Sequence, residues 1–164
     1  MIDWDGKFEL LAIDPGQRKS RANLGWALFS NDRLADATVE WSSEDLMVPG
    51  YYPFHAENTP RIAVIEAPRW YPREHRVDTN DLLDLSVLVG ELKRHFAERE
   101  ANVELVYPRT WKGTVPKDIH NKRVLAALSA DELKLLPKRP RARDYDHNVL
   151  DAVGIGLWKL GRMR

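Results

Sequence analysis

The chain has 164 residues and no Cys, and its 25 Lys and Arg balance 25 Asp and Glu, so the formal net charge is zero. Its length and its 43% hydrophobic content predict one domain, residues 1–164, with a substantial core. Disulfides and thiolate metal sites are excluded, and bulk charge gives no argument for a nucleic-acid partner. The acidic start and the absence of an apolar run of about 20 residues argue against a signal peptide and a membrane span, so we expect a cytoplasmic protein.

The first part of the chain consists of short apolar segments separated by turn residues, a pattern typical of an antiparallel meander. Asn31 and Asp32 form a turn signal between two of these segments. The next stretch, Ser42–Pro60, is interrupted by Pro and Gly and could form only a brief helix. We expect strands over 8–13, 24–29 and 37–41.

From residue 61 onward, strand-like segments alternate with stretches of helical period. The two loops expected here, 68–80 and 137–143, are rich in basic residues. This order predicts an α/β fold with a mixed sheet, in which the first and fourth strands are parallel neighbours joined by a crossover. We expect strands over 61–66 and 103–106, and helices over 79–96, 117–130 and 144–160.

Carboxylates follow two of the expected strands directly. Asp14 ends the first strand and Glu66 ends the fourth, so the two would stand side by side, about 4.8 Å apart, at the edge where open α/β sheets bind ligands. His147 and Asp151 lie one turn apart on the last helix. Like charges this close need a cation, which favours a site for hard divalent metal.

Each of these residues also has an ordinary structural interpretation. Asp14 could be a turn residue of the Asp-Pro-Gly segment, and Glu66 could be an exposed strand end. His147 and Asp151 could form a solvated pair on a helix face. Their order along one chain favours the metal site over these separate explanations.

Four short segments resemble motifs of a known enzyme family. They are Ile13-Asp14-Pro15-Gly16, Leu24-Gly25-Trp26-Ala27, Ile65-Glu66 and Asp151-Ala152. In this order, over nearly the whole chain, they resemble the RuvC branch of the ribonuclease H-like superfamily, the Holliday-junction resolvases. The resemblance implies a ribonuclease H-like α/β fold whose five-stranded mixed sheet has three antiparallel strands, then two parallel ones, flanked by helices. It also implies a homodimer. The small size of the chain and its variation from the usual motif suggest a divergent member, of a kind that a phage could encode.

The resemblance implies that Asp14, Glu66 and Asp151 hold two Mg²⁺ ions, for which Mn²⁺ may be substituted. Water would attack the scissile phosphate in line and leave 5′-phosphate and 3′-hydroxyl ends. The predicted function is therefore resolution of four-way DNA junctions by a metal-dependent endonuclease.

The fourth metal ligand departs from the family pattern. The family places Asp or His three residues before the final Asp, where this chain has Asn148, a poor ligand. His147 lies four residues before Asp151 and still faces the same side of the helix. We favour His147 as ligand or general acid/base, with Asp146 as the alternative.

Basic and aromatic residues surround the acidic motifs and predict DNA contacts. The segment 107–117 resembles the family's basic stretch that approaches the DNA backbone, with Lys112 and Lys117 on matching positions. In the family that the chain resembles, an aromatic residue just beyond this Glu enters the branch point, so Trp70 or Tyr71 could stack on an exposed base there. Alternatively, both rings could simply cover the edge of the core. The remaining predicted DNA contacts are Arg69, Arg139, Arg141 and Arg143.

The helix 79–96 has two interpretations. Its apolar face could simply cover the sheet, or the part near Leu85, Val89 and Leu92 could form the dimer interface implied by the resemblance.

Two other functions stay open. One is a ribonuclease H-like nuclease for flaps, forks or RNA–DNA hybrids, and the other is a catalytically silent DNA-binding module, which Asn148 favours. An actin-like ATPase is a weak third possibility, because it would need two domains and Gly-rich loops.

Overall fold

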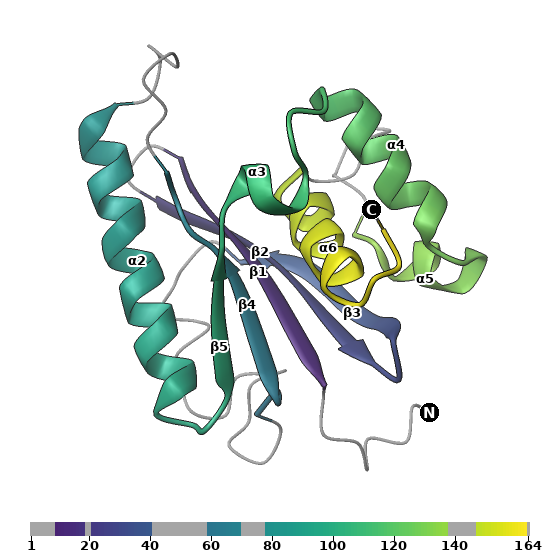
Figure 1. Ribbon diagram of the computed structural model, residues 1–164, viewed down its shortest axis with the longest axis horizontal. Helices are drawn as coiled ribbons and strands as arrows, with labels where there is room; N and C mark the ends of the chain where they lie inside the picture. The colour runs from purple at the N-terminus through teal and green to yellow at the C-terminus, as the bar shows by residue number, and fades with distance from the viewer. Residues whose placement is uncertain (1–8, 19–20, 41–58, 70–77, 138–146, 164) are drawn as a thin grey trace.

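The computed structural model describes residues 9–18, 21–40, 59–69, 78–137 and 147–163 (Figure 1). They form a five-stranded sheet in the order β3-β2-β1-β4-β5. The strands are β1 (Leu10–Arg18), β2 (Arg21–Ser30), β3 (Arg33–Glu40), β4 (Ile62–Glu66) and β5 (Asn102–Val106). The helices are α2 (Thr79–Ala97), α3 (Pro108–Trp111), α4 (Lys117–Ala127), α5 (Ala130–Leu135) and α6 (His147–Lys159).

The pairing of the strands confirms the predicted mixed sheet. β1 pairs with β2 and β2 with β3 in antiparallel fashion, whereas β1 with β4 and β4 with β5 are parallel. Asn31 and Asp32 form the predicted turn, with φ angles of 51° and 59°. Positive φ at both central residues is what a tight hairpin turn with the right twist requires, and Asn and Asp tolerate it.

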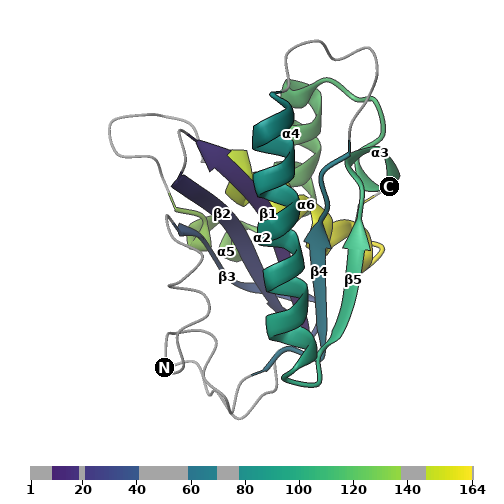
Figure 2. The same ribbon diagram turned by 90° about the vertical axis from the view of Figure 1, so that its left-hand side faces the viewer.

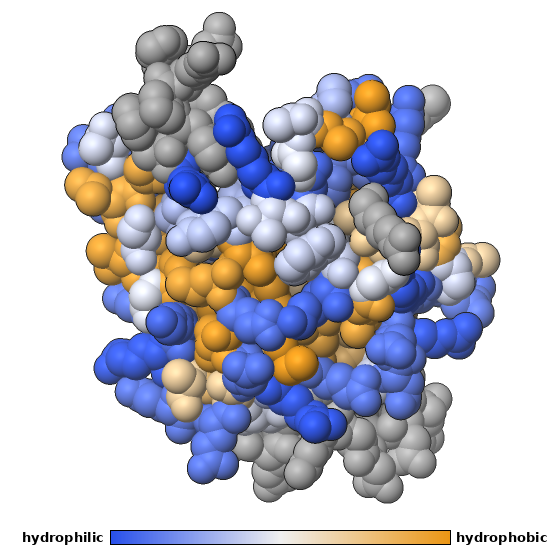
Figure 3. Space-filling model, in the orientation of Figure 1, coloured by the Kyte–Doolittle hydropathy of each residue, from blue (hydrophilic) through white to orange (hydrophobic). Residues whose placement is uncertain are grey.

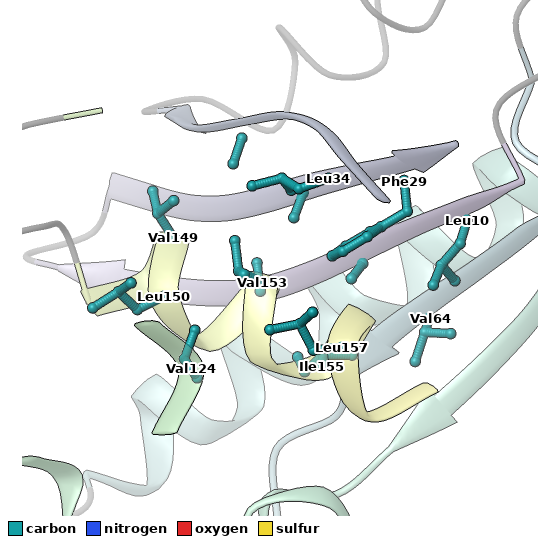
Figure 4. Close-up of a cluster of buried hydrophobic side chains, with 14 of the residues drawn as sticks. Leu10, Phe29, Leu34, Val64, Val124, Val149, Leu150, Val153, Ile155 and Leu157 are labelled. Carbon is teal, nitrogen blue, oxygen red and sulfur yellow. The ribbon is translucent and has the colours of Figure 1, made fainter. Parts of the chain in front are cut away.

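Helices cover both faces of the sheet, which forms the middle of three layers (Figures 1 and 2). Because strand side chains alternate between faces, β1 contributes to two cores. Leu11 and Ile13 pack in the cluster that contains the α2 residue Leu92. Leu10 packs in the opposite cluster with the α6 residue Val153, and Figure 4 shows these side chains between the sheet and α6.

β1 continues beyond the residue where the sequence pattern ends it. The strand was expected to stop at Ile13, but it runs on through Pro15 and pairs with β2 as far as Arg18. The β1–β4 ladder ends at Ile13 and Ile65, so Pro15 lies where β1 has only one neighbouring strand. A residue without an N–H is tolerated in such a position.

The predicted helix 117–130 is in fact two helices. α4 ends at Ala127 and α5 starts at Ala130. Ser129 caps α5, since its side chain accepts from the Glu132 N–H while the Glu132 carboxylate accepts from the Ser129 N–H. This capping box starts a new helix where the apolar period alone predicts continuation. The brief helix considered near Ser43 and the expected start of the last helix at Asp144 lie outside the described residues.

Two of the three α2 residues considered for a dimer contact belong to the core that covers the sheet. Val89 and Leu92 are only 4% and 0% exposed, because they pack against the sheet. The apolar side chains that α2 turns outward are Leu83 and Val87, at 59% and 62% exposure. Hydrophobic side chains are visible on the α2 side of the molecule in Figure 3. Among helices of the described residues, none combines the length and apolar character needed to cross a membrane.

Candidate active site

Asp14 and Glu66 stand side by side at one edge of the sheet. The register pairs Ile13 with Ile65 in parallel strands, so Asp14, within β1, and Glu66, the last residue of β4, meet where the β1–β4 ladder ends. Asp14 is buried, at 7% exposure, and Glu66 is half-buried. The sheet thus brings together the first two predicted ligands in the predicted place.

Asp151 reaches this edge because α6 lies very close to β2. Gly25, the β2 partner of Asp14, contacts the backbone of Asn148, and a Cβ at this position would collide with the Asn148 carbonyl oxygen. The absence of a side chain at Gly25 therefore lets the first turn of α6 lie against the hairpin, with buried Asp151 on the next turn.

The carboxylates interact electrostatically. The pKa of Asp14 is raised well above its ordinary value by burial, and further by the negative charges of Glu66 and Asp151. Burial also raises the pKa of Glu66, against the opposing effects of Lys112 and Trp111. Carboxylates from three distant parts of the chain therefore share one site and repel one another.

Lys112 supplies positive charge to this site. Its Nζ lies 3.3 Å from Asp151 Oδ2 and 3.8 Å from Glu66 Oε2. Burial lowers the pKa of Lys112, but Glu66, Asp151 and Asp14 together raise it above its ordinary value, so the side chain is an ammonium. We predicted a DNA phosphate as the partner of Lys112, whereas in the structure Lys112 contacts the carboxylates of Glu66 and Asp151.

Sequence reasoning missed two side chains that contact the carboxylates. The Trp111 Nε1–H donates a hydrogen bond of 2.6 Å to Glu66 Oε2. The His120 Nε2 lies 3.5 Å from Asp151 Oδ1. Trp111 directly precedes Lys112, which is a weak signal, and His120 sits in a helical stretch whose pattern suggests only amphipathic packing.

His147 and Asn148 occupy the first turn of α6. His147 is half-buried at the first position of the helix, one turn before Asp151. Asn148 is buried, and its Nδ2 donates to the backbone oxygen of Asn23 at 2.9 Å. Asn148, which occupies the position of a ligand in the family, thus links α6 to β2 through this hydrogen bond. Asp146 lies outside the described residues.

The predicted DNA-binding residues are described only in part. Lys117 begins α4, is exposed, and lowers the pKa of Asp14, so its charge acts at the site. Arg69 is exposed, with its guanidinium carbon 5.1 Å from the centre of the Tyr107 ring. The predicted contacts Trp70, Tyr71, Arg139, Arg141 and Arg143 lie outside the described residues.

No protein-family model and no curated protein matches the chain. The solved structures that resemble it at low identity include Thermus thermophilus RuvC, with a TM-score of 0.50 and 16% identity over 94% of this chain and 98% of that one. They also include the yeast mitochondrial Holliday junction resolvase Ydc2, with a TM-score of 0.57 and 13% identity over 95% of this chain and 79% of that one. The chain has the fold of the RuvC-type resolvases. T. thermophilus RuvC in complex with a Holliday junction substrate also matches, with a TM-score of 0.46 and 16% identity over 94% of this chain and 98% of that chain.

The donor set of this RuvC-type fold suits a hard divalent ion, although its present arrangement does not form a cage. Within the described ranges, no group of three or more His, Asp or Glu side chains is placed so that it could hold a metal ion. In this arrangement the Lys112 ammonium contacts both Glu66 and Asp151. Nevertheless, carboxylate oxygens are the ligands that Mg²⁺ and Mn²⁺ prefer, and this site brings several of them together.

Proposed function

We propose that the chain is a metal-dependent, structure-selective endonuclease that resolves four-way DNA junctions by paired phosphodiester hydrolysis. The observation that carries the proposal is the convergence of Asp14, Glu66 and Asp151 from β1, β4 and α6. The fold is shared with proteins described as RuvC and a Holliday junction resolvase, which supports the choice of substrate.

In the proposed reaction, the three carboxylates would hold two Mg²⁺ or Mn²⁺ ions. The bound ions would activate the attacking water and stabilise the leaving oxygen. His147, one turn before Asp151, completes the ligand set or moves a proton as general acid/base. Lys112 would leave the carboxylates on metal binding, and its ammonium would then be available to a phosphate of the DNA.

The proposed DNA surface surrounds the carboxylates with positive charge. Lys112 and Lys117 both act electrostatically on Asp14, so a phosphate bound to them lies near the reacting group. Arg69 follows β4 closely and extends this surface. The other proposed contacts are Trp70, Tyr71, Arg139, Arg141 and Arg143.

Paired cleavage requires two active sites related by symmetry, so we propose a homodimer. The outward side chains of α2, Leu83 and Val87, are the described apolar residues best placed for this contact.

Cleavage of a synthetic four-way junction tests the proposal. With Mg²⁺ or Mn²⁺, the wild-type chain should cut the junction in preference to flaps, forks and RNA–DNA hybrids. The Asp14→Asn variant should bind the junction but not cut it. Preference for a hybrid or a flap would instead establish a ribonuclease H-like nuclease with a different substrate.

A catalytically silent DNA-binding module is the second candidate function. It is favoured by Asn148, whose amide is occupied by its bond to the Asn23 backbone oxygen and whose position is that of a ligand in the family. This candidate predicts salt-dependent junction binding without nicking in either metal.

A further inference from the structure

Two buried side chains that the proposed chemistry does not use each contact one carboxylate. Trp111, from α3, donates from Nε1 to Glu66 Oε2 at 2.6 Å. His120, from α4, has its Nε2 3.5 Å from Asp151 Oδ1. The two side chains are 4% and 3% exposed, so neither is a DNA-contacting residue.

The two rings also support each other. Their centroids are 5.0 Å apart in an edge-to-face arrangement, with 73° between the ring planes. Both rings press against α6 at Gly154, one turn after Asp151. A Cβ there would lie 2.8 Å from Trp111 Cζ3 and 3.1 Å from His120 Nε2, so this close approach depends on glycine. Trp111, His120 and Gly154 thus form one packed unit behind the carboxylates.

His120 Nε2 has no hydrogen-bond partner in the described structure. A buried N–H without an acceptor is unfavourable, and Asp151 Oδ1 lies just beyond hydrogen-bond length. Bonds of this kind in active sites are often long before the ligand binds and shorten afterwards. With the proton on Nε2, the ring can hold Oδ1 and leave Oδ2, the oxygen facing Lys112, for a cation.

We propose that Trp111 and His120 are positioning residues that hold the Glu66 and Asp151 carboxylates in the orientation needed to bind divalent ions. This inference rests on the proposed function. Groups that hydrogen-bond to metal ligands from behind orient those ligands, and their loss weakens metal binding by roughly 10–100-fold. Here the Trp111 indole would orient Glu66 in this way, and the His120 imidazole would orient Asp151.

Calorimetric titration with Mn²⁺ in the absence of DNA tests the proposal. Trp111→Phe keeps a ring but removes the donor, and His120→Leu removes Nε2 at similar volume. Both should weaken Mn²⁺ binding by roughly 10-fold or more. His120→Gln, whose amide nitrogen can take the place of Nε2, should restore most of the affinity. The matched control is Trp158→Phe, because Trp158 lines the same surface cavity as Trp111 and His120.

Junction cleavage provides a second measurement. In Trp111→Phe, kcat at fixed Mn²⁺ should fall while KM for the junction stays constant, and added Mn²⁺ should recover part of the rate. A purely structural role would instead lower the melting temperature without this metal dependence.

Different results would overturn the positioning role and the proposed function. If wild-type protein binds Mn²⁺ and the two variants bind it equally well at unchanged melting temperature, the positioning role is overturned alone. If His120→Leu and His120→Gln lose affinity equally, His120 only fills space. A wild-type chain that binds no Mn²⁺ overturns the proposed function, and this inference with it.

Discussion

Lys112 has a position among the carboxylates that explains how they coexist. Its ammonium contacts Glu66 and Asp151 and acts on Asp14, and it also lies 4.9 Å from the centre of the Trp111 ring. One ammonium does not offset the mutual repulsion of three carboxylates, and the pKa of Asp14 stays raised by burial and by Glu66 and Asp151. A divalent ion would relieve the repulsion more fully, and Lys112 and the ion would compete for the same oxygens.

Replacing Lys112 should therefore tighten metal binding. In Lys112→Met, the carboxylates lose their internal cation, so Mn²⁺ should bind about tenfold more tightly, equivalent to about 1.4 kcal/mol. Melting curves over a range of Mn²⁺ concentrations measure this, because a ligand of the folded state raises the melting temperature. Lys122→Met is the matched control, since Lys122 is exposed on α4. Equal affinity in wild type and Lys112→Met would contradict the competition.

Asp14 should reduce the stability of the protein at neutral pH. Its pKa is raised in the folded chain, chiefly by burial, so ionisation there disfavours folding. The associated stability is present below the unfolded pKa, about 3.9, and is lost as pH rises through the folded pKa. Asp14→Asn should therefore melt higher than wild type at pH 7 without metal, and the difference should shrink towards pH 3.

Activity should change in the opposite direction. Nicking by Asp14→Asn should fall by at least about 100-fold, the scale expected for loss of one electrostatic stabiliser. A variant that melts lower than wild type at neutral pH, or that keeps full activity, would contradict the assignment of Asp14.

The carboxylates could be predicted from sequence, but their supporting residues could not. Asp14 and Glu66 each follow directly on an apolar run, where packing gives no reason for a charge, so they stand out. Trp111 and His120 contact the site only because α3 and α4 fold back over α6. An aromatic residue and a His in helical segments are ordinary core components, and their spacing alone contains no sign of this contact.

At the scale of elements, an ion pair between buried Glu132 and half-buried Arg162 joins α5 to the turn after α6. The Arg162 guanidinium donates to both Glu132 oxygens at 2.7 and 2.9 Å. Glu132 also accepts from the Leu34 N–H at the start of β3 and from the Ser129 N–H. The hydrogen bond from Arg162 contributes most to lowering the pKa of Glu132 well below its ordinary value, and the bonds from Ser129 and Leu34 lower it further. One carboxylate thus fixes a strand, a helix and the C-terminal turn.

Glu132→Gln should destabilise the fold by about 1–3 kcal/mol, because it leaves the Arg162 charge without its partner. Since the pKa is lowered, this stability is present above the unfolded value and is lost as pH falls through the folded value. Urea unfolding at pH 7 measures the loss. Asp131→Asn, at the exposed pair with Lys134, should change the stability by less than about 0.5 kcal/mol. Similar effects of both changes would show that the network contributes little.

The limits of elements were harder to predict than their existence. β1 continues through Asp-Pro-Gly because β2 still pairs with it there, although that segment is a common turn signal. The break between α4 and α5 depends on the Ser129–Glu132 capping box, a local contact that overrides a continuous apolar period. Strand pairing therefore sets the end of β1, and helix capping sets the start of α5, although the composition of each segment suggests otherwise.

At the scale of the whole molecule, the outer side of α2 is the candidate contact between two copies. Val87→Glu should weaken the dimer more than tenfold, because it places charge on an exposed apolar position, and sedimentation should show monomers. Ala126→Glu, the same kind of change on the exposed side of α4, is the matched control. Paired cuts in one junction should give way to single cuts. A dimer unaffected by Val87→Glu would place the interface elsewhere.

The architecture followed from the order of the segments. Two short antiparallel connections, a long crossover and then alternating strands and helices leave few arrangements of the sheet, and the observed order β3-β2-β1-β4-β5 is one of them. The orientation of α2 did not follow in the same way. Its apolar residues extend around more than one face, so the sequence alone could not separate Val89 in the core from Val87 at the surface.

Anomalous diffraction from crystals soaked in Mn²⁺ tests the central claim most directly. The account predicts anomalous density between the carboxylates of Asp14, Glu66 and Asp151, with the Lys112 ammonium displaced from its positions 3.3 and 3.8 Å from Asp151 and Glu66. Crystals in which Lys112 keeps both contacts at saturating Mn²⁺, with no density among these carboxylates, would contradict it.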